Sequence, residues 1–257
     1  MRNLSRSIAI GVALALVVAA SAFAKPEVVR VGNLVLTDDG GVFPSKLPRG
    51  RQAPVKAKLR ATIATADGTH PPASREVVID IDKHIELNAR GLPACKASQL
   101  NARDTRAARR ACGGAIVGRG SGQVEIAFPE QKPIPVSSPL TMFNGGVRGG
   151  KTTILVHAFI TVPVPAAIVA TVKINRIRRG PYGMHTVTRI PTISGGAGSV
   201  TGFKLDIDRK FAHRGKRRSY LTASCPAGRH LVKGRVKFDD GTLLKIVHPL
   251  PCTPRRG

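Results

Sequence analysis

The feature that most restricts the fold of this chain is a series of short segments in which apolar and polar residues alternate. Between Val55 and Ile63 every second residue is apolar, and Lys56, Lys58 and Arg60 occupy positions between them. Because successive side chains of a β-strand point to opposite faces of the sheet, this pattern predicts a half-buried strand with a basic outer face. Similar segments, bounded by glycine or proline, recur to the C-terminus.

The spacing of these segments predicts the fold class. Short alternating runs without helices between them indicate an all-β protein, either an antiparallel β-sandwich or a barrel-like meander. Residues 96–111 are the exception, because they contain no proline or glycine and only one β-branched residue, Thr105. We therefore expect one short helix between Cys95 and Cys112.

The composition divides the chain into four segments. Residues 1–24 carry two arginines, an apolar run and an Ala-Phe-Ala ending, the pattern of a cleaved export signal. We expect an N-terminal β region with the helix at 25–128 and a C-terminal antiparallel β meander at 140–257. The proline-rich residues 129–139 are a linker candidate, although the two β regions could form one domain. No other apolar run is long enough for a transmembrane helix, so we expect a mature chain that does not span a membrane.

The four cysteines predict two disulfides. An exported chain reaches an oxidising compartment, and the cysteines are even in number without a C-x-x-C spacing, which favours disulfides over a metal site. Three pairings are possible. We favour Cys95–Cys112 and Cys225–Cys252, because each pair brackets one local element. The second pair would close the open end of a hairpin predicted over residues 232–246, which has an Asp-Asp-Gly turn.

Positive charge is the strongest functional signal. The chain has 41 basic and 15 acidic residues and a formal net charge of +26. Such a charge attracts polyanions in a salt-dependent way. The densest stretch has ten basic residues and no acidic one, and we predict a polyanion-binding surface there if they share one sheet face. These residues are Arg209, Lys210, Arg214, Lys216, Arg217, Arg218, Arg229, Lys233, Arg235 and Lys237.

The class of polyanion follows from the aromatic content. The chain has no Trp and only two Tyr, so it offers few rings that could stack on bases or sugars. Sequence-specific binding of nucleic acid is therefore disfavoured. An anionic cell-wall polymer or an acidic polysaccharide is the expected partner.

One local motif suggests nucleotide chemistry. Residues 145–152 match the phosphate-loop pattern G-x-x-x-x-G-K-[ST]. A phosphate loop must open a helix, whereas the residues that follow are β-branched and run into proline. The motif is therefore interpreted as the turn of a hairpin.

The titratable residues show no catalytic or metal-binding spacing. The pairs Asp80/Asp82 and Asp206/Asp208 could bind Ca²⁺, but in a chain this basic we expect them to pair with neighbouring strands. The seven histidines show neither an H-x-H nor an H-E-x-x-H spacing. We therefore predict a protein without catalytic activity, cofactor or metal.

Several short motifs suggest a relationship to other proteins. They are Gly91-Leu92-Pro93 before Cys95, Phe143-Asn144-Gly145, Leu155, His157, Pro163-Val164-Pro165, Gly183, Gly198, and Ser219-Tyr220-Leu221 before Cys225-Pro226. With these motifs the chain resembles a group of uncharacterised exported β-rich proteins common in high-GC Gram-positive soil bacteria. The resemblance covers nearly the whole mature chain and implies secretion and disulfides, but it carries no activity.

Together these patterns predict an exported, non-catalytic protein of the cell envelope or extracellular space. It would bind an anionic polymer or surface through a basic sheet face. The alternative is a carrier of an apolar or lipid-like ligand inside a barrel or half-barrel. A large dry cavity lined by Ile154, Val156, Ile168 and Val172 would favour the carrier, whereas a filled core would favour surface binding.

Overall fold

The alternating segments form the strands of one large antiparallel sheet. The computed structural model describes residues 25–255, so the predicted export signal lies outside the described residues. The main strands are β1 (Glu27–Val31), β2 (Leu34–Phe43), β4 (Ala53–Thr65), β5 (Ser74–Asp82), β7 (Ile116–Ile126), β8 (Ile134–Arg148), β9 (Lys151–Ile160), β10 (Ala166–Arg179), β11 (Tyr182–Arg189), β12 (Gly198–Ile207), β16 (Arg229–Phe238) and β17 (Leu243–Pro251).

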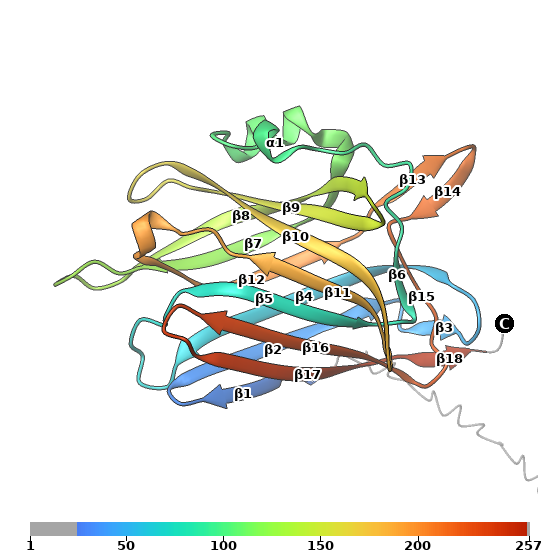
Figure 1. Ribbon diagram of the computed structural model, residues 1–257, viewed down its shortest axis with the longest axis horizontal. Helices are drawn as coiled ribbons and strands as arrows, with labels where there is room; N and C mark the ends of the chain where they lie inside the picture. The colour runs from blue at the N-terminus through green and yellow to red at the C-terminus, as the bar shows by residue number, and fades with distance from the viewer. Residues whose placement is uncertain (1–24, 256–257) are drawn as a thin grey trace, which may run out of the picture.

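The order of these strands makes a nearly closed barrel. In residues 25–255 the twelve strands follow one another as β1-β2-β4-β12-β7-β8-β9-β10-β11-β5-β16-β17, with antiparallel pairing throughout (Figure 1). The last strand, β17, lies beside β1 and β2, so the two ends of the ladder meet. The all-β antiparallel prediction is confirmed, and its barrel-like form is the one observed.

Six further short strands complete the fold within the described residues. β15 (Leu221–Ala223) pairs with β4 and with β6 (Ile85–Leu87), and β3 (Lys46–Pro48) pairs in parallel with β18 (Thr253–Arg255). The remaining two, β13 (Lys210–His213) and β14 (Lys216–Ser219), form a separate hairpin that projects from the barrel at the upper right of Figure 1.

The two β regions predicted from composition contribute to the same sheet. β12 of the C-terminal region lies between β4 and β7 of the N-terminal region, and β11 pairs with β5. β8 begins at Ile134, so residues 134–139 of the proline-rich segment lie in a strand paired with β7.

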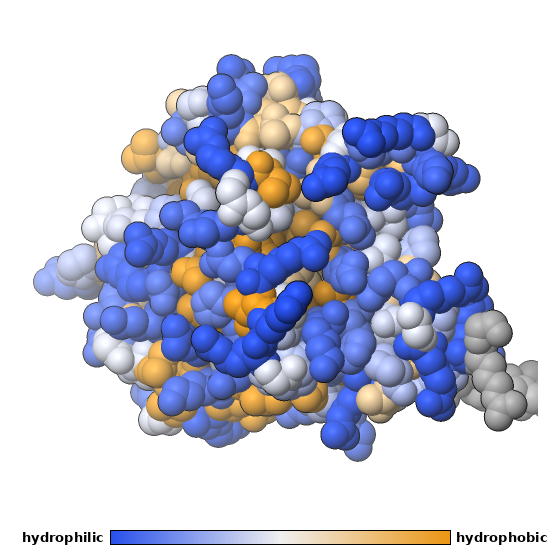
Figure 2. All heavy atoms as spheres, turned by 45° about the vertical axis from the view of Figure 1, so that its right-hand side comes forward, coloured by the Kyte–Doolittle hydropathy of each residue, from blue (hydrophilic) through white to orange (hydrophobic). Residues whose placement is uncertain are grey.

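The inward faces of the strands form the core. Val55, Ile154 and Ile174 belong to the main cluster, which collects side chains from most of the barrel strands. Two further clusters are centred on Phe238 and Ile126. Complete burial of one such aliphatic or aromatic side chain stabilises the fold by roughly 1.5–3 kcal/mol. On the face shown in Figure 2 the outside of the barrel is mainly hydrophilic, with hydrophobic patches between the polar side chains.

The segment that matches the phosphate-loop pattern forms a hairpin turn, as predicted. Gly149 and Gly150 join β8 to β9, and both have positive φ angles, 54° and 74°. A two-residue hairpin turn with positive φ at both positions strongly favours glycine. Because a strand follows the turn, these residues do not form a phosphate loop.

Both predicted disulfides are present. Cys95 is bonded to Cys112 and Cys225 to Cys252, the second pair lying at the open end of the β16–β17 hairpin. Two disulfides indicate an oxidising, extracytoplasmic environment. Among residues 25–255, no helix has the length and apolar character needed to cross a membrane.

The predicted helix lies between Cys95 and Cys112 and is short. It is α1 (Thr105–Ala111), and 3-10 turns precede and follow it. The carboxylate of Asp104 accepts a hydrogen bond from the backbone N–H of Ala107 at 2.7 Å. This is the geometry of an N-terminal cap, so Asp104 ends the preceding irregular segment and starts the helix.

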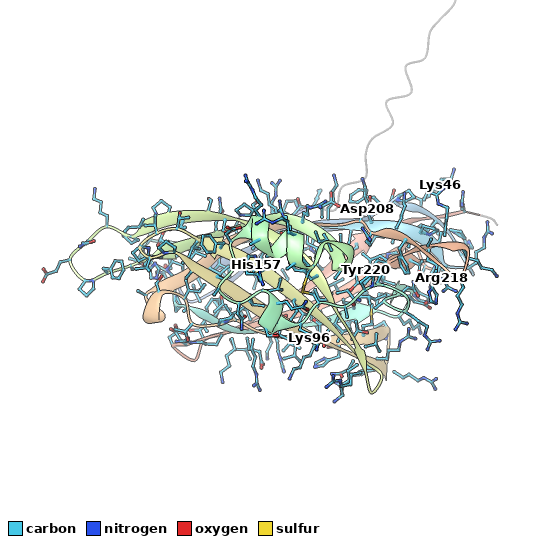
Figure 3. The ribbon with its side chains drawn as sticks, turned by 90° about the horizontal axis from the view of Figure 1, so that it is seen from above. Lys46, Lys96, His157, Asp208, Arg218 and Tyr220 are labelled. Atoms are coloured by element: carbon cyan, nitrogen blue, oxygen red, sulfur yellow. A yellow bond between two sulfur atoms is a disulfide. The ribbon has the colours of Figure 1, made fainter. Side chains whose placement is uncertain are left out.

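The helical segment covers the outer face of β8 and β9. Leu100 packs there with Phe143 and Leu155, and all three side chains are buried. His157 donates from Nε2 to the carbonyl oxygen of Arg103 at 2.9 Å. Burial lowers the pKa of His157, which favours the neutral imidazole beneath this segment (Figure 3).

A histidine–carboxylate pair lies at the seam where the barrel closes. Nδ1 of His248 on β17 is 2.8 Å from Oδ2 of Asp38 on β2. The His248 side chain is 2% exposed and that of Asp38 is 28% exposed, so the imidazole is shielded from water while the carboxylate keeps partial contact with it. The hydrogen bond to the Asp38 carboxylate raises the pKa of His248 and outweighs the opposite effect of burial.

This pair predicts a pH dependence of stability. The folded protein holds the His248 proton more tightly than the unfolded chain, so the stabilisation is fully present below pH 6.5 and is lost as the pH rises through the raised pKa. Asp38→Asn removes the carboxylate. We expect its free energy of unfolding, from urea titrations at several pH values, to fall less steeply above pH 6.5 than that of the wild type.

Asp208→Asn is the matched control, because Asp208 is exposed and makes no ion pair among residues 25–255. Its pH profile should follow the wild type. Equal slopes for Asp38→Asn and Asp208→Asn would contradict the assignment.

Candidate functional site

Four neighbouring strands, β2, β4, β12 and β7, present two rows of mainly polar residues on their outer face. Cross-strand pairing fixes both rows, because directly opposite residues point to the same side of the sheet. The first row is Asp39, Arg60, Lys204 and Ser121. The second row is Gly41, Lys58, Asp206 and Arg119.

These rows line a surface hollow of about 470 Å³, which we call the cationic groove. Its lining consists of the two rows together with Phe43, Gly40, Leu59, Gly120 and Leu205.

Phe43 and Gly41 shape one side of the cationic groove. An ideal Cβ at Gly41 would lie 3.0 Å from the Phe43 ring, so the missing side chain leaves room for the ring. The Lys58 ammonium group lies 6.0 Å from the centre of the same ring, at the outer limit of a cation–π contact. The groove therefore combines an aromatic face with its positive charges.

Glycines also form part of the floor of the groove. A Cβ at Gly120 would overlap the carbonyl oxygen of Lys204 on β12, and one at Gly40 would lie 2.8 Å from the carbonyl oxygen of Lys58 on β4. The close approach of neighbouring backbones at these two positions requires residues without a side chain.

The basic side chains of the groove have no acidic partner in the described part of the chain. Lys58, Arg60, Arg119 and Lys204 form no ion pair within 4.0 Å. The groove has four cations and two carboxylates, so the net charge of its lining residues is positive. These cations can exchange water and counter-ions for an anionic ligand without first breaking an ion pair.

A second hollow, of about 350 Å³, adjoins the cationic groove. Arg119 and Asp206 line both hollows, and the second adds Asp208 and Arg209. A guanidinium nitrogen of Arg209, Nη2, donates to the carbonyl oxygen of Gly114 at 3.3 Å, which holds the side chain against the segment before β7. The chain continues from Arg209 directly into β13.

The structure divides the ten basic residues predicted from sequence into two groups. Arg209 and the β13–β14 hairpin follow the end of β12. In Figure 3, Asp208 and Arg218 lie toward the same end of the barrel. This group comprises Arg209, Lys210, Arg214, Lys216, Arg217 and Arg218. The second group is on β16, on the opposite side of the barrel from β12, and comprises Arg229, Lys233, Arg235 and Lys237. The ten residues therefore do not share one sheet face.

The β16 group lies opposite acidic residues. Lys233 is paired across the ladder with Asp80 on β5, and Lys237 with Glu76. Opposite charges at directly paired positions offset one another. With four cations and two opposed carboxylates, the β16 group has the same formal charge balance as the cationic groove, but its residues line neither of the two hollows.

The two predicted acidic pairs differ in environment. Asp80 is 2.6 Å from Nδ1 of His185 on the neighbouring strand β11. Asp82 is 2.8 Å from Nδ1 of His84, and its second oxygen accepts from the N–H of Leu231 at 2.9 Å. Asp80 thus pairs with a neighbouring strand, as predicted, whereas the histidine partner of Asp82 is only two residues away along the chain. Asp206 and Asp208 line the two hollows and, contrary to the prediction, form no ion pair within 4.0 Å among the described residues. In the described range, no group of three His, Cys, Asp or Glu side chains could hold a metal ion.

Sequence reasoning found only part of this site. The alternation at 55–63 identified the basic face of β4, but Arg119 and Lys204 come from strands far away in sequence. The signal for Arg119 was the alternation of glycine and polar residues from Gly118 to Gly122, which marks a strand with a bare inner face. Only the strand order shows that these residues meet.

Comparison with known proteins gives no family for this chain. Neither protein-family models nor curated proteins match the sequence, and no solved structure matches the fold. The resemblance to exported proteins of soil bacteria therefore stays a prediction, and function is inferred from the geometry of the site.

The close backbone contact at Gly120 predicts that a methyl group added there destabilises the fold. Gly120→Ala forces a Cβ against the Lys204 carbonyl, and we expect it to lower the free energy of unfolding by about 1–3 kcal/mol in urea titrations. Gly50→Ala is the control, because nothing lies within 4 Å of the added Cβ. If the two variants are equally stable, the backbones do not approach at Gly120 as described.

Proposed function

We propose that this protein binds an anionic polymer outside the cytoplasm, and that the cationic groove is its principal contact surface. The observation that carries the proposal is the convergence of four cations without ion pairs on one surface hollow. The two disulfides support a place outside the cytoplasm, and the proposed destination is the cell envelope or the extracellular space.

The arrangement favours a polymer over a single small anion. Neighbouring strands are about 4.8 Å apart, so the three strands that carry the cations, β4, β12 and β7, spread them over roughly 10 Å. A ligand with several regularly spaced negative charges can contact more than one row, whereas a single small anion can reach only one or two cations. An acidic polysaccharide or an anionic wall polymer has this character.

The side chains in the groove suit carboxylate, sulfate or phosphate groups. Arg60 and Arg119 can each donate two parallel hydrogen bonds to such a group. Ser121 adds a hydroxyl, and the Phe43 ring adds an apolar surface for the uncharged part of the polymer. The groove thus offers both charge and a non-polar contact.

The second hollow and the β13–β14 hairpin extend the groove. Arg209 lies in the adjoining hollow, and the five basic residues of the hairpin follow it along the chain. They are exposed or only half-buried, so we assign them long-range attraction and additional polymer contacts rather than a fixed geometry.

Packing of the interior supports surface binding over the carrier alternative. Ile154 is buried in the main core cluster, and Val156 and Val172 pack against the same cluster. Ile168 packs against the cluster around Ile126. The four residues that would line a ligand cavity are therefore used for core packing.

Binding should depend on the groove more than on total charge. The triple variant Arg60→Gln, Arg119→Gln, Lys204→Gln should weaken affinity for heparin or purified wall polymer at least about tenfold, that is by about 1.4 kcal/mol, in a titration at low salt. The matched variant Lys233→Gln, Arg235→Gln, Lys237→Gln loses the same charge on β16. Equal losses for the two variants would show that only net charge matters.

Binding should also depend steeply on salt. We expect the wild-type protein to be retained on immobilised heparin at low salt and released between low and moderate salt, because counter-ions compete with exposed cations. Replacing Arg217, Arg218 and Lys233 together should move elution to lower salt. Wild-type protein in the flow-through at low salt would remove the proposal.

A further inference from the structure

A serine, a histidine and a glutamate form a hydrogen-bonded chain outside the cationic groove. Ser199 Oγ is 3.0 Å from Nε2 of His70, and Nδ1 of the same imidazole is 2.7 Å from Oε1 of Glu125. Ser199 and Glu125 lie directly opposite each other on β12 and β7. His70 comes from the loop between β4 and β5, which places the ring between the two side chains.

The hydrogen bonds assign a role to each nitrogen of the ring. The Glu125 carboxylate can only accept, so Nδ1 of His70 donates to it. In the neutral ring this leaves the lone pair of Nε2 directed at the Ser199 hydroxyl. A hydroxyl beside a base that is itself oriented by a carboxylate is the arrangement of an activated serine nucleophile.

The backbone holds Ser199 in a fixed position. A 3-10 turn at Ser194–Gly196 precedes it, and there Gly195 and Gly196 have φ angles of 67° and 109°. A Cβ at Gly198 would lie 2.6 Å from Cγ2 of Ile193, so the chain packs tightly just before the serine. Ser199 itself is 1% exposed. Its hydroxyl is therefore almost enclosed by the surrounding chain.

We propose that Ser199 is a nucleophile toward esters of small acyl groups, with His70 as the general base and Glu125 as a positioning residue. The inference does not depend on polymer binding in the groove. It also departs from the expectation of a non-catalytic protein. The sequence did not indicate this site, because the three residues are far apart in sequence and match no serine-hydrolase motif.

The reaction balances with water as the only co-reactant. Ser199 Oγ bonds to the acyl carbon and its proton passes to Nε2 of His70. The bond from the acyl carbon to the alcohol oxygen breaks, and the alcohol leaves with that proton. Water then attacks the acyl carbon and gives a proton to His70. The acid is released, and the proton on His70 restores the Ser199 hydroxyl.

The local hydrogen bonds predict slow turnover. The N–H groups of Gly196 and Gly198 donate to the carbonyl of Ile193, and that of Ala197 donates to Ser194. These donors are engaged in the turn and are not free to stabilise an oxyanion, a contribution worth roughly 10²–10³ in rate. Covalent labelling, which accumulates with time, is therefore the more sensitive readout.

The test is labelling with methanesulfonyl fluoride, a small reagent, followed by intact-mass and peptide mass spectrometry. The Ser199 Oγ–sulfur bond forms, the sulfur–fluorine bond breaks, fluoride leaves and the proton passes to His70. We expect one adduct, mapped to Ser199 in the folded, disulfide-bonded protein. His70→Gln should slow labelling at least about 100-fold. An unlabelled Ser199 in the wild type would overturn the proposal.

Two further variants separate chemistry from structure. Ser137→Ala removes an exposed serine of the neighbouring strand β8, outside both hollows, and should leave labelling unchanged. Glu125→Gln should slow labelling at an unchanged melting temperature, with partial recovery in Glu125→Asp, because a merely structural role would not alter the rate. Labelling of Ser199 that is indifferent to both His70 and Glu125 would also overturn the proposal.

Acyl-group size gives an independent readout. We expect release of p-nitrophenol from the acetate ester to exceed that from the hexanoate ester, because Ser199 is nearly enclosed. The Ser199→Ala rate on acetate should equal that of buffer. A Ser199→Ala variant as active as the wild type would refute esterolysis at this serine.

Discussion

The hydrogen-bonded ladder that runs from β1 to β17 is the constraint on which the other features depend. Side chains alternate across a strand with a period of two, so a slip of one residue between paired strands would exchange the inner and outer faces. Such a slip in β4 would turn Lys58 and Arg60 into the core and Leu59 toward water. The cationic groove, the core clusters and the pair that closes the seam all require the same register.

One irregularity in that ladder places the two candidate sites on the same face. Ser199 and Lys204 are five residues apart, and a regular strand would point them to opposite sides. The pairing of β12 with β7 shifts between Val200 and Gly202, so one extra residue is inserted on β12. This β-bulge restores the outward direction for both side chains. On β7 the matching residues, Ser121 and Glu125, are four apart and need no bulge.

Features coded by neighbouring residues could be predicted from the sequence. The turn at Gly149 and Gly150, the disulfide across the β16–β17 hairpin and the basic face of β4 each depend on residues within one element or its immediate flanks. The helix was predicted in the right place, although its start at Asp104 depends on a single capping contact.

Features that depend on strand order could not be predicted. Nothing local indicates that β12 inserts between β4 and β7, yet this insertion brings Arg60, Lys204 and Arg119 together. For the same reason, the sequence leaves open whether the ten basic residues share one sheet face. The chain turns out of the barrel after β12 and returns on its opposite side as β16, which separates the run into two groups. The pairing of Ser199 with Glu125 across β12 and β7 could not be predicted for the same reason.

The central claim is that an anionic polymer binds across the cationic groove. Lysine acetylation footprinting tests it directly, because one sample reports on both sides of the barrel at once. In the presence of an acidic oligosaccharide, Lys58 and Lys204 should acetylate more slowly, while Lys233 and Lys237 on β16 keep their rates. Protection of the β16 lysines alone, or equal protection of all four, would contradict the account.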